Sequence, residues 1–310
     1  MVTCWLLSHL EGSPGNEQVL AAARRRGLSL VLVDPAAVAV RFFGARPEFR
    51  IPWGPDGEEN HTGEKWGRPR WVFTRMGGSA PSEALQVLRL LELAGVRCTN
   101  RFFALQVARD KEAMTAAFLE AGVPCPRSVV VPPMGDYEIA AESLAGPPWV
   151  LKLAAGAGGG GVSLVESIRS LRSVGDTLSA LGQRVVVQEF VEEARGADTR
   201  VFVLGGEVLG AMRRQGRRGE FRSNLHRGGG ATAVEVTDEL AALASKAAAA
   251  VGLEVAGVDV VEGPKGPLVL EVNGAPGLEG LSSALGEDLA DRILDHLEER
   301  EEKGERDHDE

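Results

Sequence analysis

The stretch GPLVLEVNGAPGLEGL, residues 266–281, decides the fold of this chain. It begins as an apolar strand, yet that strand carries Glu271 and Asn273, whose spacing of two residues sends both side chains to one face. Upstream, VAGVDVV at residues 255–261 has the composition of a second strand, and the turn-rich EGPKGP between them predicts an antiparallel hairpin. A turn centred near Lys265 places Asp259 opposite Glu271.

This register separates the two faces of the hairpin. Val258 is expected opposite Val272 and Val260 opposite Leu270 on one face, while the three polar side chains share the other. Two carboxylates that face each other across a sheet repel unless something neutralises them. A solvated polar face is the alternative, but an all-oxygen set of Asp, Glu and Asn on one face favours a Mg²⁺ site.

Composition places the chain among soluble globular proteins of about two domains. It has 310 residues, of which 44% are hydrophobic and 25% charged, and its apolar runs are shorter than the ~20 residues of a membrane span. The N-terminal MVTCWLLSHL lacks a basic leader and a cleavage site, so we expect a core strand and a cytoplasmic protein. Three separated cysteines without CxxC spacing indicate neither a disulfide framework nor a zinc site.

The net charge of -10 is unevenly distributed. Residues 298–310 hold eight acids and three Arg or Lys, which predicts a disordered acidic tail. Residues 213–227 hold six arginines and one glutamate, which predicts a local anion site. A single aromatic residue in that basic run is poor material for stacking on bases, so we expect no direct nucleic-acid binding. The short apolar runs predict no membrane partner.

Alternation of strands and helices divides the chain. Up to about Val96 the pattern is βαβ, typical of a parallel α/β domain, interrupted by the Gly-, Pro- and charge-rich excursion at 50–70. A mixed α+β segment follows from Cys98, and Gly205-Gly206 between two alternating apolar runs predicts another hairpin. The helix TDELAALASKAAAAVG then leads to the two strands described above.

A glycine-rich loop and two lysines predict phosphate binding. The sequence GAGGGG, residues 156–161, contains a G-x-G-x-x-G pattern, but a strand follows it, so it is a flap between strands and not a dinucleotide-binding loop. A flexible hairpin tip is the alternative for such a loop. Lys152 interrupts the apolar strand WVLKLA, where an unpaired ammonium is costly, and is expected to point at an anion. Lys111 begins a predicted helix, where a cation opposes the helix dipole unless it meets a phosphate.

Eight stretches of this sequence together resemble the ATP-grasp ligases, and most closely the RimK family of glutamate ligases. They are ARDK, WVLKL, GAGGGGV, VVVQEFV, DTRVFVLGGEVLGAMRR, FRSNLHRGGG, VAGVDVV and LVLEVNGAPGLEG. The resemblance extends from about Arg75 to Ile293. It implies an ATP-grasp fold with an N-terminal parallel α/β domain at 1–97, a central lobe with the glycine-rich flap at 98–187 and a C-terminal lobe at 188–297, followed by the acidic tail at 298–310.

The resemblance also implies roles for individual residues. Lys111, Lys152 and the flap glycines Gly156, Gly159 and Gly161 would hold phosphates; Gln188, Glu189, Phe190 and Val191 would contact adenine, and Asp198 the ribose. Arg213, Arg222 and Asn224 would face the phosphates and the acyl-phosphate intermediate, with Arg222 and Asn224 also binding ATP. Asp259, Glu271 and Asn273 would bind two Mg²⁺ or Mn²⁺ ions.

The implied activity is ATP-dependent amide formation. Through an acyl phosphate, the enzyme would add L-glutamate or a similar amino acid to a peptide or protein C-terminus, such as that of a ribosomal protein, or to another glutamate. A small-metabolite ligase and a non-catalytic nucleotide-binding regulator are the alternatives. Related ligases form homo-oligomers, but the sequence leaves the oligomeric state open.

Overall fold

The computed structural model describes residues 4–51, 66–133, 135–155, 161–180, 182, 184–194, 196–216 and 230–306. The chain divides into two compact units. Unit 1 comprises Met1–Leu105, Leu253–Val255 and Gly274–Glu310, and unit 2 comprises Gln106–Gly252 and Ala256–Asn273. No helix among the described ranges is both long enough and apolar enough to cross a membrane.

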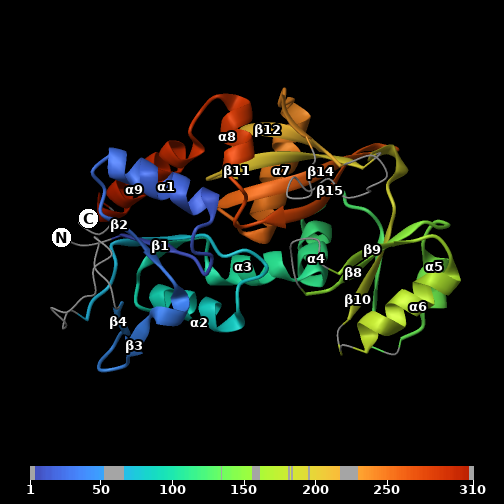
Figure 1. The fold of residues 1–310 in the computed structure, drawn as a ribbon, viewed down its shortest axis with the longest axis horizontal. Helices are drawn as coiled ribbons and strands as arrows, with labels where there is room; N and C mark the ends of the chain where they lie inside the picture. The colour runs from blue at the N-terminus through green and yellow to red at the C-terminus, as the bar shows by residue number, and fades with distance from the viewer. Residues whose placement is uncertain are drawn as a thin grey trace. The chain divides into compact units, whose positions relative to one another are not determined.

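Unit 1 is built on a parallel sheet whose strand order is β2-β1-β5-β6. Its strands are short, and β1, β2 and β5 are strongly apolar, as expected for a sheet covered on both faces. Figure 1 shows α1 and α9 on one side of the sheet and α2 on the other. The elements of this unit are β1 (Cys4–Leu7), α1 (Pro14–Arg25), β2 (Leu30–Val33), η1 (Pro35–Ala37), β3 (Ala39–Arg41), β4 (Glu48–Arg50), β5 (Trp71–Thr74), α2 (Ser82–Leu93), β6 (Arg97–Thr99), the start of α3 (Phe102–Arg109), α8 (Glu279–Leu285) and α9 (Leu289–Arg306). The predicted parallel α/β fold of the N-terminal region is confirmed.

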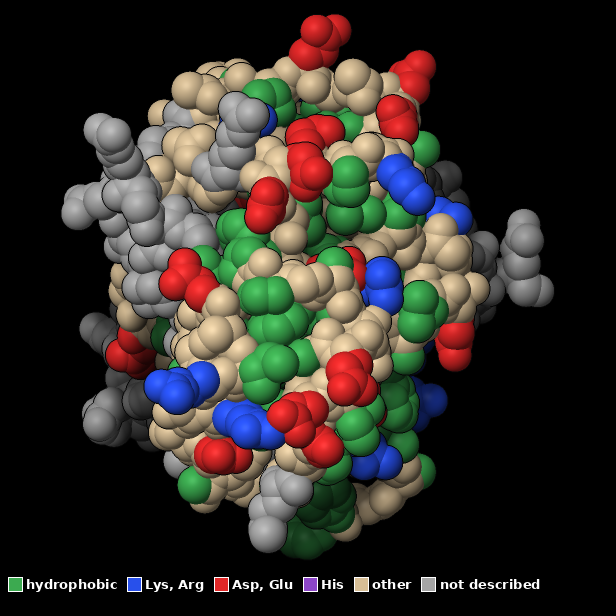
Figure 2. Space-filling model, turned by 90° about the vertical axis from the view of Figure 1, so that its right-hand side faces the viewer, with side chains coloured by type: hydrophobic (Ala, Val, Ile, Leu, Met, Phe, Trp, Pro, Cys, Tyr) green, Lys and Arg blue, Asp and Glu red, His purple; other side chains and the backbone are tan. Residues whose placement is uncertain are grey.

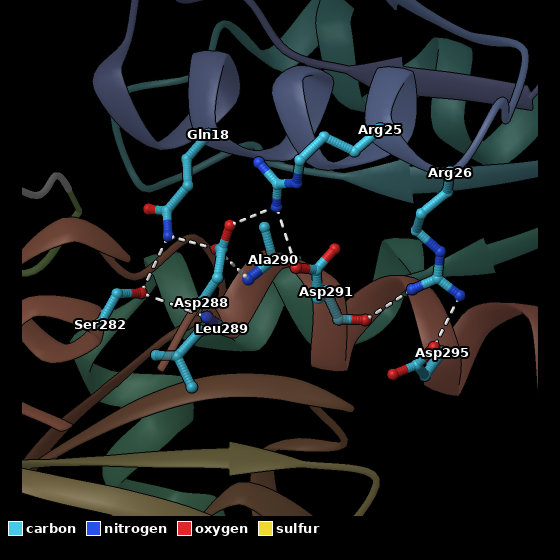
Figure 3. A network of polar contacts seen from close by, with 9 residues as sticks. All are labelled: Gln18, Arg25, Arg26, Ser282, Asp288, Leu289, Ala290, Asp291 and Asp295. Atoms are coloured by element: carbon cyan, nitrogen blue, oxygen red, sulfur yellow. Dashed lines mark hydrogen bonds and ion pairs between the residues drawn. The ribbon is translucent and has the colours of Figure 1, made fainter. Parts of the chain in front are cut away.

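Polar contacts join the two ends of the chain within unit 1 (Figure 3). From α1, Gln18 Nε2 donates to Asp288 Oδ1 at 2.6 Å, and Arg25 pairs with Asp288 at 2.6 Å and with Asp291 at 2.9 Å. Helix α9 continues to Arg306, past residue 298, where the sequence predicted a disordered tail. Arg26 reaches this extension through Glu298 at 2.6 Å, so ion pairs to α1 support helix where composition alone favours disorder.

Unit 2 holds two antiparallel sheets with strand orders β7-β10-β8-β9 and β13-β12-β11-β14-β15. Helices α5 and α6 cover one face of the first sheet, where Trp149, Leu151 and Val187 form a buried core. The elements are α4 (Lys111–Ala121), β7 (Ser128–Val131), α5 (Tyr137–Ser143), β8 (Trp149–Leu153), β9 (Val162–Val165), α6 (Ile168–Ser179), β10 (Val185–Glu189), η2 (Glu192–Ala194), β11 (Ala197–Leu204), β12 (Glu207–Gln215), β13 (Gly230–Val234), α7 (Asp238–Val251), β14 (Val255–Gly263) and β15 (Gly266–Asn273).

Both hairpins predicted for the last third are present, and each contains a register shift. The β11–β12 hairpin turns at Gly205-Gly206, and its register shifts between Phe202 and Val203. The β14–β15 register shifts between Asp259 and Val260. Such bulges place one extra residue in one strand and alter which side chains share a face beyond them.

On the face shown in Figure 2, the described Lys, Arg, Asp and Glu side chains are interspersed with hydrophobic ones.

Candidate functional site

The β14–β15 hairpin brings two carboxylates together. Asp259 lies opposite Glu271, as predicted, and Asn273 lies opposite Gly257 on the same face as Glu271. The predicted pairing of Val260 with Leu270 is wrong: Val260 lies opposite Val269 because the bulge inserts Leu270 as an extra residue. Asp259, Glu271 and Asn273 therefore share one face of the hairpin, as predicted.

Lys152 and Gln188 lie on the face of the β7–β10 sheet that α5 and α6 leave uncovered. Lys152 follows the buried Leu151 on β8 and therefore points to the opposite face. Its Nζ donates to Gln188 Oε1 at 2.7 Å, and Gln188 Nε2 donates to Ser128 Oγ at 3.0 Å. The side chain of Gln188, expected at the adenine, thus orients a lysine expected at the phosphates.

Lys111 is the first residue of α4, as predicted. The N-cap is Asp110, whose side chain accepts from the backbone N–H groups of Glu112 and Ala113 at 2.9 and 3.2 Å. The Lys111 backbone N–H donates to the carbonyl of Ala154 at 2.9 Å, which ties the start of α4 to the end of the strand that carries Lys152.

The electrostatics join these groups into one site. Burial lowers the pKa of Lys111 and of Lys152, and the Glu271 charge opposes that shift in both. Burial and then the Asp259 charge raise the pKa of Glu271, against the effect of Lys152. Two lysines and Glu271 are therefore close enough to act on each other inside a poorly solvated region.

Asp259 has a different environment because two arginines bind it. Arg200 donates to both carboxylate oxygens, Nη2 at 2.6 Å, and Arg214 Nη2 lies 2.9 Å from Oδ2. Arg214 also binds Asp198 through two bonds, with Nε to Oδ1 at 2.6 Å. Although burial acts to raise the pKa of Asp259, the charges and hydrogen bonds of Arg200 and Arg214 lower it to about 2.

The sequence analysis missed Arg200 and Arg214. The available signal was alternation: Asp198 and Arg200 are two residues apart on β11 and share a face, and Arg214 lies directly across from Asp198. Arg213, expected at the phosphates, is exposed and points to the opposite face of β12, where it lines a recess with Glu193, Thr199 and Glu262. Asp198, expected at the ribose, is held by Arg214.

The remaining predicted residues are placed only in part. The Glu189 carboxylate accepts from the Ala145 N–H at 3.0 Å and pairs with Arg127 at 3.2 Å. Phe190 and Val191 are half-buried between β10 and η2. Gly161 precedes β9 with a φ of 76°, a backbone conformation that suits glycine. Four predicted residues lie outside the described residues: Gly156, Gly159, Arg222 and Asn224.

The donor set fits a hard cation bound together with phosphate. No group of three or more His, Cys, Asp or Glu side chains suited to a metal occurs in the described part of the chain. Mg²⁺, however, is commonly held by one or two carboxylates plus phosphate oxygens. The facing pair of Asp259 and Glu271 would fit such a site, and burial and the Asp259 charge raise the pKa of Glu271, a shift that a bound cation would oppose.

Comparison with known proteins gives concordant matches. The family model of the RimK-like ATP-grasp domain matches residues 108–297. A probable alpha-L-glutamate ligase from Serratia proteamaculans is 37% identical over 284 residues, which cover 92% of this chain and 91% of that protein. Another probable alpha-L-glutamate ligase, from Halorhodospira halophila, is 37% identical over 287 residues, which cover 93% of this chain and 92% of that protein.

Solved structures share the fold. A RimK domain ATP-grasp protein from Sphaerobacter thermophilus has a TM-score of 0.69 and 24% identity, and the match covers 95% of this chain and 99% of that one. The ATP-grasp ligase PsnB, in complex with a phosphomimetic variant of its minimal precursor, Mg and ADP, has a TM-score of 0.71 and 22% identity, with 97% and 99% covered.

Proposed function

From the premise that this chain belongs to the RimK-like ATP-grasp family and is an ATP-dependent ligase, we propose that it adds L-glutamate or a similar amino acid to a peptide or protein C-terminus or to another glutamate. The names of its relatives support glutamate as the amino acid. The precursor peptide PsnA2 bound by PsnB supports a peptide acceptor. The observation that carries the proposal is the facing pair of Asp259 and Glu271 beside Lys111 and Lys152.

In the proposed reaction, the acceptor carboxylate attacks the γ-phosphorus of ATP, which forms an acyl phosphate and releases ADP. The amino group of the incoming amino acid then attacks the acyl carbon, phosphate leaves, and the nitrogen loses a proton to give the amide. Such phosphoryl transfer depends on positioning and charge neutralisation more than on covalent help from the protein.

Different residues of this chain would bind the phosphates, the metal and adenine. Lys111 and Lys152 would bind phosphate oxygens, and Gln188 would hold Lys152 in place through the 2.7 Å hydrogen bond. Asp259, Glu271 and Asn273 would hold Mg²⁺, which when bound supplies positive charge to the phosphates. The backbone at residues 188–191 would contact adenine.

The test is ADP release by the purified protein with ATP and Mg²⁺, measured across single amino acids and short acidic peptides with mass spectrometry of every product. We expect products heavier by one or more glutamate residues. Glu271→Ala should abolish ADP release while far-ultraviolet circular dichroism stays unchanged, and unchanged turnover would remove Glu271 from the metal site. Products made only from a small metabolite would identify a metabolite ligase, and nucleotide binding without ADP release from any pair would favour a regulator.

A further inference from the structure

Asn100 is a completely buried residue that follows β6 in unit 1. Its Oδ1 accepts from the backbone N–H groups of Glu254 at 2.7 Å and Val255 at 2.8 Å. Its Nδ2 donates to the carbonyls of Val255 at 2.7 Å and Gly274 at 3.0 Å. The carboxamide has two donor hydrogens and two acceptor sites, so every hydrogen-bonding position of this side chain is used.

These partners stand where the chain passes between the two units. The chain leaves unit 1 after Val255 and returns at Gly274, with Ala256–Asn273 belonging to unit 2. That excursion contains most of the β14–β15 hairpin and all three predicted metal ligands. The last paired residues of the hairpin are Gly257 and Asn273, so Asn100 binds both strands just beyond the end of their own ladder.

Close packing makes this anchor rigid. A Cβ added to Gly274 would lie 2.6 Å from Leu105 Cδ2, 3.1 Å from Leu253 Cδ2 and 3.3 Å from Asn100 Nδ2. Leu105 and Leu253 are themselves buried. Leu105 is the last residue of unit 1 before the chain enters unit 2, and Leu253 is the first residue after the chain returns to unit 1. We call Asn100, Leu105, Leu253 and Gly274 the crossing cluster.

We propose that Asn100 is a positioning residue that fixes both ends of the ligand-bearing β14–β15 hairpin, and so sets the placement of the Asp259 and Asn273 side chains toward the metal. The inference rests on the proposed function, because it needs those residues to bind a metal. Gly274, whose carbonyl Asn100 holds, is the next residue after Asn273, and Val255 lies four residues before Asp259 on one continuous strand. A small backbone rotation at Val255 or Gly274 would therefore move Asp259 or Asn273 directly, because the chain between them is short and continuous.

Asn100 could alternatively stabilise the fold and nothing more, so the test needs a control that lowers stability elsewhere in unit 1. Leu88 on α2 is fully buried and takes no part in the hydrogen bonds and close contacts described above for the crossing cluster, so Leu88→Ala is a control that removes core packing. Asn100→Ser replaces the carboxamide with a shorter hydroxyl group that cannot make all four of these hydrogen bonds. Asn100→Asp keeps its size and the Oδ1 acceptor but places an oxygen against the carbonyls of Val255 and Gly274.

Each protein is assayed for melting temperature, for nucleotide affinity without metal, and for Mn²⁺ affinity with a non-hydrolysable ATP analogue, from the electron paramagnetic resonance signal of free Mn²⁺. We expect both Asn100 variants to weaken Mn²⁺ binding by tenfold or more, while metal-free nucleotide affinity changes by less than twofold. Leu88→Ala should lower the melting temperature and leave Mn²⁺ affinity within twofold. Gly274→Ala, a second perturbation of the crossing cluster, should act like the Asn100 variants.

Two results would overturn the inference. Mn²⁺ affinity within twofold of wild type in the folded Asn100 or Gly274 variants would leave the cluster with a structural role only. Mn²⁺ affinity that falls equally in Leu88→Ala would show that general loss of stability causes the effect. If the wild-type protein binds no Mn²⁺ in the presence of nucleotide, the metal site of the proposed function is itself wrong. If the wild type binds Mn²⁺ and the Asn100 variants bind it equally well, only the role of Asn100 is wrong.

Discussion

Asp259→Asn is the substitution that most directly tests the charge balance of the site. The carboxylate is 3% exposed and neutralises two guanidinium groups that are 8% and 4% exposed, Arg200 and Arg214. The amide keeps the size of the side chain and removes its charge. Arg200 then loses the carboxylate that accepts its described hydrogen bonds and keeps the charge of Glu271 nearby, whereas Arg214 keeps Asp198.

The structure sets the expected magnitude. Binding to the arginines lowers the pKa of Asp259 from its ordinary 3.8 to about 2, which corresponds to about 2 kcal/mol of stability at neutral pH. Removing the carboxylate that Arg200 binds in the interior raises the cost toward about 3–5 kcal/mol, the order of magnitude for a broken buried pair. For a unit of this size, about 2 to 4 °C per kcal/mol predicts a fall in melting temperature of roughly 4–20 °C.

The assay is thermal unfolding at pH 7 in EDTA without nucleotide, compared with the control Asp291→Asn. Asp291 is 41% exposed and pairs with Arg25 on the surface, so its loss should cost less than about 1 kcal/mol. Because the folded pKa of Asp259 lies below its unfolded value, its contribution is complete above about pH 4 and disappears as the pH falls toward 2. A fall in melting temperature no larger than that of Asp291→Asn at pH 7 would refute this account of the cluster.

Four further outcomes follow from the same geometry. In metal-free protein at pH 7, Glu271→Gln should raise the melting temperature. Burial and Asp259 raise the pKa of Glu271, so its ionised form disfavours folding. Calorimetry should show this gain vanish as the pH falls below 4.5, where Glu271 is protonated in both the folded and the unfolded protein. Lys152→Met should weaken ATP binding by about tenfold or more, measured by calorimetric titration, since a buried charged contact contributes more than about 1.4 kcal/mol. Arg214→Ala should reduce both ADP release and melting temperature more than Arg213→Ala, whose side chain is exposed on the other face; equal losses would contradict the assigned faces. Arg26→Ala should lower the melting temperature by only a few degrees, and 1 M NaCl should remove most of that difference, because its carboxylate partners are exposed.

The hairpins show how far the sequence determines this site. Turn residues and alternation predicted both hairpins and the pairing of Asp259 with Glu271. Near the β14–β15 turn, Gly263 lies opposite Gly266, and without a bulge that register would place Asp259 opposite Leu270. The bulge restores the predicted pair. Sequence alternation carries no direct signal for a bulge, so the prediction was correct for the carboxylates and wrong for Val260.

The β11–β12 bulge explains why Arg214 was overlooked. With Leu204 opposite Glu207 at the turn, an unbroken ladder would place Arg213 opposite Asp198. The bulge shifts the register by one residue, so Arg214 meets Asp198 and Arg213 moves to the other face. The contact of Arg200 with Asp259 then depends on the neighbouring position of β11 and β14 in the sheet. The hairpin signals in the sequence did not specify that order.

The two facing carboxylates differ in a way that assigns them different tasks. The protein neutralises Asp259 with its own arginines and lowers its pKa to about 2, whereas burial and Asp259 raise the pKa of Glu271. Lys152 and Lys111 act to lower the pKa of Glu271, but burial and the Asp259 charge outweigh them. Glu271 is therefore the carboxylate whose charge gains most from a bound cation, and a ligand that brings both phosphate and metal would satisfy the lysines and Glu271 together. It follows that removing Glu271 should affect metal-dependent binding more than folding, and removing Asp259 should affect both.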